Sequence, residues 1–243
     1  MKQQIIAGRN PVLELLQSEQ EVEKVLISKS ASGDVVKQII QTCRDREVYY
    51  QFVPEVKLNT LSRANHQGVL AFTSLITYQQ VQEVIDFVFA KGEEPLLLIL
   101  DKVTDVRNLG ALARTALGLG VHALIFPKKE SAAVNDVAVK ISAGALLKLP
   151  LCRVDNIVAT IKDIKNNGIR VIGLDGSASH FIHESDTKMP LALVAGSEDE
   201  GIELAVQRQL DELVKLPMHS ELESYNVSVA AAMALYEIHR QRI

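Results

Sequence analysis

The sequence predicts an α/β protein in which a small N-terminal α/β domain precedes a larger α/β domain with a parallel sheet. Short helical patterns and short strand-like runs alternate through the first part of the chain. After Pro95 the apolar runs become continuous and alternate with helical segments, which is typical of parallel strands covered on both faces. We therefore expect an N-terminal domain over residues 1–75, a linker carrying one helix over 76–94, and a second domain over 95–243.

The N-terminal part should begin with a helix at Asn10, because asparagine caps helices and Pro11 suits the first helical position. A strand is then expected at 25–27, a helix at 35–43 and a strand at 68–72. The helix of the linker should span 84–89, where apolar residues follow helical spacing.

The second part should alternate strands with helices. Apolar runs predict strands at 96–100, 121–126, 169–174 and 191–195, and helical patterns cover 156–166 and 227–242. In parallel sheets of this kind, ligands bind beyond the carboxyl ends of the strands. Three polar loops fall at that edge, so we expect them to meet in one crevice.

Composition limits the classes of function. A chain of 243 residues with 47% apolar content can bury a sizeable core, and its net charge of −4 does not indicate a broad nucleic-acid-binding surface, so any RNA site must be local. No apolar segment reaches membrane-spanning length and the first residues lack a signal-peptide core, so we expect a cytoplasmic location and no membrane partner. Cys43 and Cys152 should be reduced, buried thiols.

The first polar loop, Asn108-Leu109-Gly110, leads into a helix that carries Arg114. Asn108 could simply cap this helix, and Arg114 could be an ordinary surface residue or could hold a phosphate near the helix N-terminus. The second loop places Gly196 and Gly201 around three acids, which suits either a solvated turn before a helix or a binding loop. A metal site is disfavoured, because no second ligand cluster accompanies these acids.

The third loop carries Ser224, Asn226 and Ser228 before an Ala-rich terminal helix. Any of the three could cap that helix, but capping explains only one of them. The run His180-Phe181-Ile182-His183-Glu184 matches neither common zinc-protease order and should lie in a loop, so we expect no metal there.

Together, the three loops resemble the three motifs of the SpoU/TrmH branch of the SPOUT RNA methyltransferases. The resemblance is carried, in order and spacing, by Asn108-Leu109-Gly110 with Arg114, by 196–201, and by Leu216-Pro217-Met218 with Ser224 to Ala230. Segments 8–12 and 66–69 look like the substrate-binding domain of bacterial rRNA guanosine 2′-O-methyltransferases, so the resemblance covers nearly the whole chain.

The resemblance implies a ribosomal-protein-like N-terminal domain that binds RNA, a C-terminal trefoil-knot (SPOUT) methyltransferase domain, and a homodimer. It also implies S-adenosylmethionine as cofactor. The expected reaction is methylation of the ribose 2′-hydroxyl of a guanosine in large-subunit 23S rRNA. The positions where the family contacts the methyl donor are occupied in this chain by Gly196, Leu216, Met218 and Tyr225. The positions where the family has catalytic or substrate-orienting groups are occupied by Asn108, Arg114, Glu198, Ser224 and Asn226.

The sequence departs from the family pattern at four positions. Tyr225 replaces a common leucine, and Asp199 stands where glycine is frequent. Glu221 and Glu223 add negative charge where an RNA backbone should arrive. The alternatives are a tRNA ribose 2′-O-methyltransferase and a non-catalytic RNA-binding or ribosome-assembly relative. A generic nucleotide-binding protein is disfavoured, because the glycines form no GxGxxG fingerprint.

Overall fold

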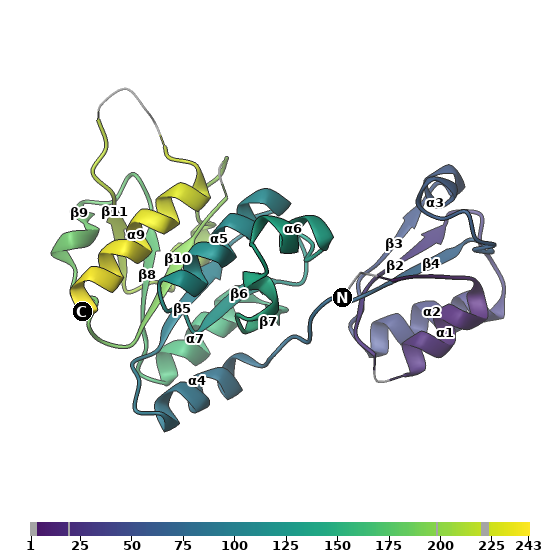
Figure 1. Ribbon diagram of the computed structural model, residues 1–243, viewed down its shortest axis with the longest axis horizontal. Helices are drawn as coiled ribbons and strands as arrows, with labels where there is room; N and C mark the ends of the chain where they lie inside the picture. Colours follow the sequence, from purple (N-terminus) through teal and green to yellow (C-terminus); the bar gives the residue numbers. More distant parts are fainter. Residues whose placement is uncertain (1–3, 19, 198, 220–223) are drawn as a thin grey trace. The chain divides into compact units, whose positions relative to one another are not determined.

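The computed structural model describes residues 4–18, 20–197, 199–219 and 224–243. The chain forms two compact units, Met1–Thr77 and Tyr78–Ile243, and each has its own sheet and its own hydrophobic core (Figure 1). The expected division into a small and a larger α/β part is therefore present. All the residues predicted to form the binding site belong to the second unit.

The first unit has a four-stranded sheet in the order β1-β4-β2-β3. Its elements are β1 (Ile5–Ala7), α1 (Arg9–Gln17), β2 (Val22–Ser28), α2 (Asp34–Asp45), β3 (Tyr50–Val53), α3 (Glu55–Leu61) and β4 (Val69–Thr73). α1 and α2 bury Leu16 and Ile39 against Val25 and Ile27 of the sheet. α1 begins at Arg9, two residues before Pro11, the expected first helical position. Asn10 is not its cap, because Gly8 takes that place with φ 105°, a backbone conformation that glycine adopts without strain.

The second unit has a seven-stranded, wholly parallel sheet in the order β7-β6-β5-β10-β8-β11-β9. Its strands are β5 (Leu96–Leu100), β6 (Ala123–Pro127), β7 (Leu151–Val154), β8 (Arg170–Leu174), β9 (His180–Phe181), β10 (Leu191–Ala195) and β11 (Glu212–Lys215). The four continuous apolar runs give β5, β6, β8 and β10. The short strands β7, β9 and β11 were not predicted, because too few apolar residues mark them.

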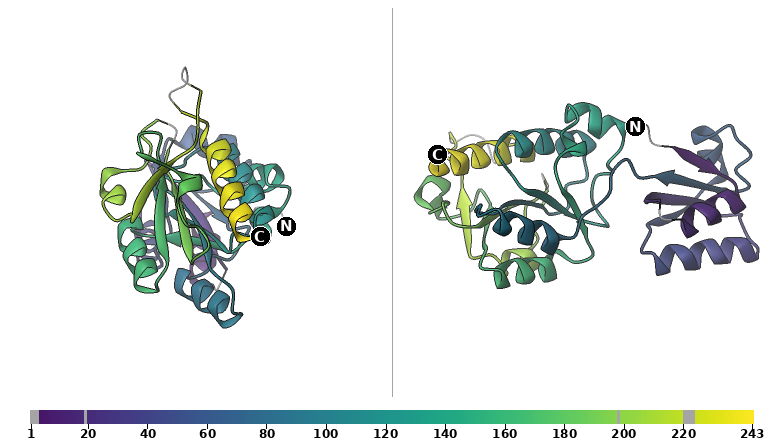
Figure 2. Two further views of the ribbon diagram at one scale, coloured as in Figure 1. Left: turned by 90° about the vertical axis from the view of Figure 1, so that its left-hand side faces the viewer. Right: turned by 60° about the horizontal axis from the view of Figure 1, so that its bottom comes forward.

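The helices of the second unit cover both faces of this sheet, as the continuous apolar strands require. They are α4 (Val81–Ala90), α5 (Val106–Gly118), α6 (Asp136–Ile141), α7 (Ile157–Asn166), α8 (Leu204–Gln207) and α9 (Val227–Arg242), with short 3₁₀ turns η1 (Ala145–Leu147) and η2 (Ile182–Glu184). In Figure 2, α5 and α9 lie on one side of the sheet and α4 and α7 lie on the other.

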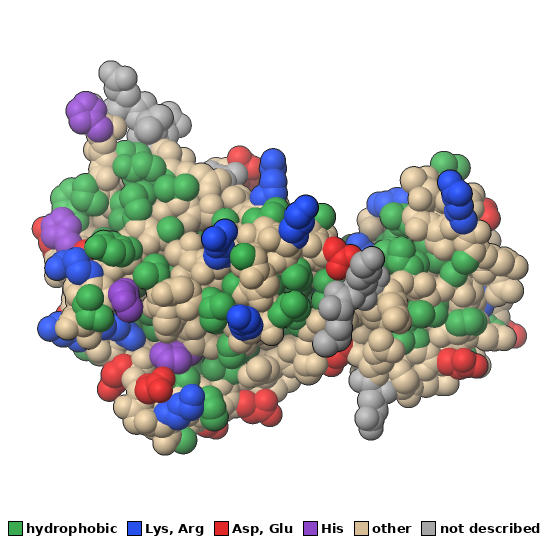
Figure 3. All heavy atoms as spheres, in the orientation of Figure 1, with side chains coloured by type: hydrophobic (Ala, Val, Ile, Leu, Met, Phe, Trp, Pro, Cys, Tyr) green, Lys and Arg blue, Asp and Glu red, His purple; other side chains and the backbone are tan. Residues whose placement is uncertain are grey.

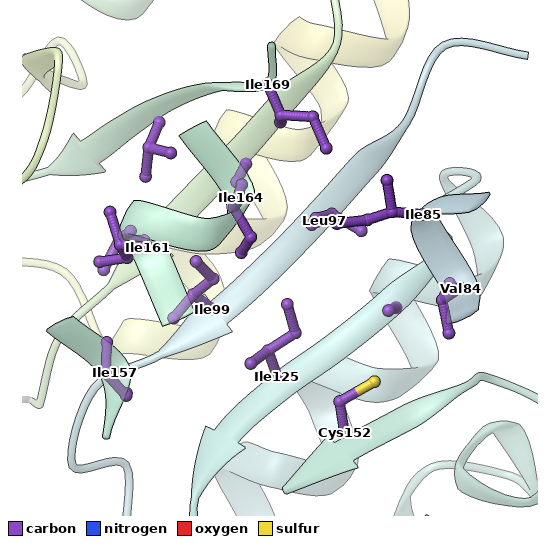
Figure 4. Packing of buried hydrophobic residues seen from close by; sticks show 14 of the residues in the cluster. Val84, Ile85, Leu97, Ile99, Ile125, Cys152, Ile157, Ile161, Ile164 and Ile169 are labelled. Carbon is purple, nitrogen blue, oxygen red and sulfur yellow. The ribbon is translucent and has the colours of Figure 1, made fainter. Parts of the chain in front are cut away.

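The helix expected in the linker packs as part of the second unit. α4 buries Val84, Ile85 and Val88 in a cluster that includes Leu97 of β5 and Ile161 of α7 (Figure 4). Burying three such side chains holds the helix against the sheet, at about 1.5–3 kcal/mol for each side chain removed from water. The division between the units therefore falls between Thr77 and Tyr78, near the expected start of the linker. Most of the segment expected to be a linker thus belongs to the second unit.

Both cysteines are buried free thiols, as expected: Cys43 lies in α2 and Cys152 in β7. Burial raises the pKa of each thiol to about 12. Across the described residues, no helix has both the length and the apolar character needed to cross a membrane.

Candidate active site

The first predicted loop lies at the start of α5. Asp105, not Asn108, caps this helix, since its Oδ1 accepts the backbone N–H of Arg107 at 2.6 Å. Hydrogen bonds from Arg107 lower the pKa of Asp105 to about 2, so the cap is charged at neutral pH. Asn108 consequently lies in the first helical turn, and Arg114 lies two turns further on.

Gly110 serves the packing of α5 against α6. A Cβ added at Gly110 would lie 2.8 Å from Cβ of Ile141 and 2.9 Å from the carbonyl oxygen of Ala138. These distances are too short for any side chain, so the glycine at position 110 is what allows α5 and α6 to approach so closely.

The second loop leaves β10 and returns on itself at once. Ser197 and Gly201 exchange two backbone hydrogen bonds, of 3.0 and 3.1 Å, which close the loop at its base. A Cβ added at Gly196 would overlap the backbone of Gly201 and Ile202, so only glycine fits. Glu198, predicted to be catalytic, lies outside the described residues, as do Glu221 and Glu223.

Two residues at the end of β5 hold the exit of this second loop. Asp101 is only 3% exposed, and its Oδ2 accepts the backbone N–H of Glu203 at 2.7 Å. The next residue, Lys102, adopts φ 55° and places its Nζ 3.0 Å from Oε2 of Glu203. Burial raises the pKa of Asp101 above its ordinary value. Sequence reasoning did not single out Asp101, although it ends a buried strand beside the predicted site.

The third loop ends at the N-terminus of α9. Asn226 is the cap of this helix: its Oδ1 accepts the backbone N–H of Ser228 at 3.0 Å and that of Val229 at 3.4 Å. The hydroxyl of Ser228 also donates to the same oxygen, at 2.6 Å. Tyr225 donates its hydroxyl to the carbonyl oxygen of Pro217 at 3.2 Å, which fixes its ring across the loop. Of the three capping candidates, the structure selects Asn226.

These segments surround a cavity of about 420 Å³, which lies within the usual size range of small-molecule sites. All four residues predicted to contact a methyl donor line it: Gly196, Leu216, Met218 and Tyr225. Ser224 and Asp199 line it as well. The second and third loops therefore meet in one crevice at the carboxyl edge of the sheet, as predicted.

The first loop was expected in the same crevice, but none of its residues, all of which the structure describes, lines the cavity, and one hydrogen bond joins it to the third loop. Nδ2 of Asn226 donates a hydrogen bond to Oδ1 of Asn108 at 3.2 Å, which joins the N-termini of α9 and α5. Arg114 is exposed on α5 and forms no hydrogen bond or ion pair within the part of the chain that the structure describes. Its guanidinium is therefore available to an external anion.

A fourth segment, which sequence reasoning missed, completes the cavity wall. Leu174, Asp175, Gly176 and Ser177 follow β8 and line the cavity. Asp175 organises this turn, since its Oδ1 accepts the backbone N–H and the hydroxyl of Ser177 at 2.8 and 2.6 Å. The signal was present in the sequence, because a polar, glycine-containing turn directly follows a continuous apolar run here too.

The His180 to Glu184 run forms β9 and η2 and not the expected loop. Within the described ranges, no group of three or more His, Cys, Asp or Glu side chains is arranged to hold a metal ion.

Comparison with family models gives two matches that together span most of the chain. Residues 95–236 match the SpoU rRNA Methylase family, and residues 5–79 match the RNA 2′-O ribose methyltransferase substrate binding family.

Known proteins agree with these matches. A TrmH family tRNA/rRNA methyltransferase of Bacillus subtilis, YacO, is 35% identical over 98% of this chain and 95% of its own length. A protein of Staphylococcus saprophyticus with the same family name is 34% identical over 100% of this chain and 97% of its own length.

Solved structures share the fold. The SpoU methyltransferase AviRb from Streptomyces viridochromogenes, solved with AdoMet, has a TM-score of 0.63 at 23% identity and covers 99% of this chain and 90% of its own. The TrmH/SpoU tRNA modifying enzyme of A. aeolicus has a TM-score of 0.57 at 28% identity, over 66% of this chain and 83% of its own. The first comparison supports the fold of nearly the whole chain, and the second supports the fold of about two thirds of it. The chain belongs to the SpoU rRNA Methylase family of S-adenosylmethionine-dependent RNA methyltransferases.

Proposed function

We propose that the protein methylates a ribose 2′-hydroxyl in RNA, and that this ribose belongs to a guanosine of large-subunit 23S rRNA. The observation that carries the proposal is the contact between Asn226 and Asn108 beside a cavity lined by Gly196, Leu216 and Tyr225. This arrangement gathers residues from three separate parts of the sequence at one point. The match of the first unit to a ribose methyltransferase substrate-binding family supports the choice of the 2′-hydroxyl.

The cavity residues fit S-adenosylmethionine. Leu216, Val227 and Ala230 offer apolar contacts for an adenine ring, and Tyr225 offers an aromatic ring beside them. At Gly196 the wall has no side chain, so a ligand can approach the backbone closely. The lining contains three acids (Asp175, Asp199 and Glu200) and no Lys, Arg or His among the described residues, which suits a ligand with positively charged groups.

The protein's own part in the reaction is to position and to stabilise charge. When bound, S-adenosylmethionine supplies an electrophilic methyl group, which the ribose oxygen must approach in line as its proton leaves. Asn108 and Asn226 lie at two helix N-termini, where partial positive charge favours a developing oxyanion. In this proposal, holding the ribose in that geometry supplies much of the rate increase.

Arg114 is proposed to anchor an RNA phosphate and to stabilise the developing negative charge. A guanidinium with a pKa above about 12 is a poor proton acceptor near neutral pH, so the proton goes to phosphate or water. Arg114→Lys keeps the charge and loses the fork that binds two phosphate oxygens. We expect its kcat/KM to fall about tenfold or more, and near-full activity of this variant would contradict bidentate anchoring.

The preference for rRNA over tRNA rests on the first unit. The matched substrate-binding family covers residues 5–79, whereas the tRNA modifying enzyme of A. aeolicus aligns with only 66% of this chain. A tRNA substrate is the alternative, because the relatives are named for both RNAs.

The proposal also includes a homodimer, a trefoil-knotted chain path in the second unit and a cytoplasmic location, all of which stay predictions. Sedimentation equilibrium tests the dimer, since one chain has a mass of 26.7 kDa. A particle with the mass of a single chain at micromolar concentration would contradict it.

The deciding experiment has two stages. Calorimetric titration with S-adenosylmethionine should show saturable binding, and no binding with or without RNA would favour the non-catalytic relative. Unmodified transcripts of 23S rRNA and of tRNA are then incubated with protein and tritiated donor, and methylated riboses are mapped by their resistance to alkaline cleavage. Methylation of tRNA alone would reverse the order of the two substrates.

A further inference from the structure

Two aromatic rings and one cation form a group that the proposed reaction does not use. The rings of Phe181 and His183 are stacked, with centroids 5.4 Å apart and planes inclined by 11°. Nζ of Lys215 lies 5.0 Å from the centroid of the Phe181 ring. We name Phe181, His183 and Lys215 the aromatic stack.

Lys215 connects the aromatic stack to the candidate active site. Lys215 is the last residue of β11 and pairs in parallel register with Phe181, the last residue of β9. Both therefore lie at the carboxyl edge of the sheet. The next residue after Lys215 is Leu216, which lines the cavity.

The aromatic stack is accessible. The side chain of His183 is exposed, and Phe181 and Lys215 are partly exposed. Lys215 forms no ion pair with any residue that the structure describes, so its charge is open to an external anion.

The neighbouring acids already have partners. Oε2 of Glu184 accepts the backbone N–H of Phe181 at 2.7 Å. Glu212 is bound by the guanidinium of Arg170 at 2.5 Å, and its other oxygen lies 3.8 Å from Nδ1 of His180. On α9, Glu237 is bound by Arg240 at 2.8 and 2.9 Å. The two arginine pairs reduce the negative charge that an approaching phosphate would meet.

The surroundings carry further positive charge. In Figure 3, Lys, Arg and His side chains gather at the edge of the second unit where β9 and the C-terminal end of α9 lie in Figure 1. Because the chain has a net charge of −4, a surface on it that binds RNA needs a local concentration of positive charge such as this one.

We propose that an unpaired base of the RNA substrate stacks on the exposed ring of His183, and that the adjoining phosphate binds Lys215. Stacking of bases on Phe and His, together with a nearby cation, is how many proteins hold single-stranded RNA. The inference rests on the proposed function, because the bound strand is the one whose ribose enters the cavity. It assigns to this surface the placement of a nucleotide that flanks the methylated one.

The chain offers a matched control. Phe87 and Lys91 of α4 form a second aromatic and cation pair, with Nζ 4.4 Å from the ring centroid, and Phe87 is 61% exposed. α4 runs into the start of β5, so this pair lies at the amino edge of the sheet, away from the cavity. Changes there test whether any exposed ring beside a lysine binds RNA.

The experiment uses the full chain and two readouts. Binding of a labelled single-stranded oligoadenylate is followed by fluorescence anisotropy at several salt concentrations. The KM for RNA is measured with whichever transcript the wild type methylates. The variants are His183→Ala, His183→Tyr and Lys215→Gln, with Phe87→Ala and Lys91→Gln as controls.

We expect His183→Ala to weaken oligoadenylate binding and to raise the KM for RNA about fivefold or more, while His183→Tyr restores both, since a ring remains for stacking. Lys215→Gln should lower the slope of log affinity against log salt by about 0.7, the value for one phosphate contact on a single strand. The Kd for S-adenosylmethionine should stay unchanged in all variants, and the control variants should behave like the wild type.

An unchanged KM and an unchanged salt slope in His183→Ala and Lys215→Gln would overturn the inference while leaving the proposed function intact. Equal losses in the Phe87→Ala and Lys91→Gln controls would overturn it too, because the effect would then be general. If the wild type methylates no RNA, the proposed function itself fails and the inference falls with it.

Discussion

Asn226 donates a hydrogen bond from its side-chain nitrogen to the side-chain oxygen of Asn108, at 3.2 Å, across 118 positions of sequence. The same Asn226 caps α9 with its oxygen. One side chain thus fixes the N-terminus of α9 and ties it to that of α5. Partial positive charge at these two helix ends would stabilise a phosphate or an oxyanion bound there.

These two roles of Asn226 can be separated by substitution. Asn226→Ala loses the cap and should lower the free energy of unfolding by about 1 kcal/mol. Asn226→Ser keeps a capping oxygen and loses the bond to Asn108, so its stability should stay near that of the wild type while kcat falls about 10²-fold. Urea unfolding and single-turnover methylation measure the two quantities. A kcat for Asn226→Ser within a factor of two of the wild type would mean that Asn226 is only a cap.

Gly196→Ala should damage the cofactor cavity. The added Cβ would overlap the backbone of Gly201 and Ile202, so the loop must move, and we expect the Kd for S-adenosylmethionine to rise at least tenfold, as about 1.4 kcal/mol of binding free energy would be lost. Gly118→Ala, where nothing lies within 4 Å of the added Cβ, is the control and should bind the cofactor normally. Calorimetry decides, and equal Kd values for the two variants would refute the steric argument.

Asp101→Ala should loosen the exit of the second loop. The backbone N–H of Glu203 would lose its hydrogen bond to Asp101, which costs about 0.5–1.5 kcal/mol of stability. The loop lines the cavity, so cofactor affinity should fall with it. Asp101→Asn retains an acceptor oxygen and should bind cofactor nearly as well as the wild type. Similar Kd values for Asp101→Ala and Asp101→Asn would show that this hydrogen bond does not position the loop.

The raised pKa of Asp101 gives a separate pH test. Its pKa is higher in the folded protein, so the folded state binds the proton more tightly and the contribution of Asp101 to stability falls as pH rises from its ordinary value of about 3.9 through the raised value. Asp101→Asn carries no such proton. Its Tm relative to the wild type should therefore increase as pH rises through that window. Parallel melting curves at all pH values would contradict the expected shift.

The thiols of Cys43 and Cys152 should be unreactive in the folded protein. Burial raises the pKa of both to about 12, so little thiolate exists near neutral pH and the sulfur atoms are shielded from reagents. A coloured disulfide reagent at pH 8 should label neither cysteine until urea unfolds the chain. Prompt labelling of one thiol in the folded state would show that its unit opens readily.

Much of the second unit could be predicted because its strands are buried on both faces. β5 and β10 were predicted to the residue, since a parallel strand between two helical layers must be apolar throughout. β7, β9 and β11 were not, because a short strand that includes polar residues carries too weak a pattern. The start of α1 was also missed. Gly8 caps this helix without a side-chain hydrogen bond, so no capping side chain marks the position in the sequence.

The sequence by itself determined the α/β class, the larger parallel sheet and three loops that belong to its carboxyl edge, because hydrophobic periodicity and glycine placement are local properties of the chain. Only the tertiary structure decided that Asn226 caps α9 while contacting Asn108, that Asp101 holds the second loop, and that Asp175 completes the cavity. These contacts join residues distant in sequence, and a hydrogen bond between them depends on where the sheet places its strand ends, which no local pattern encodes.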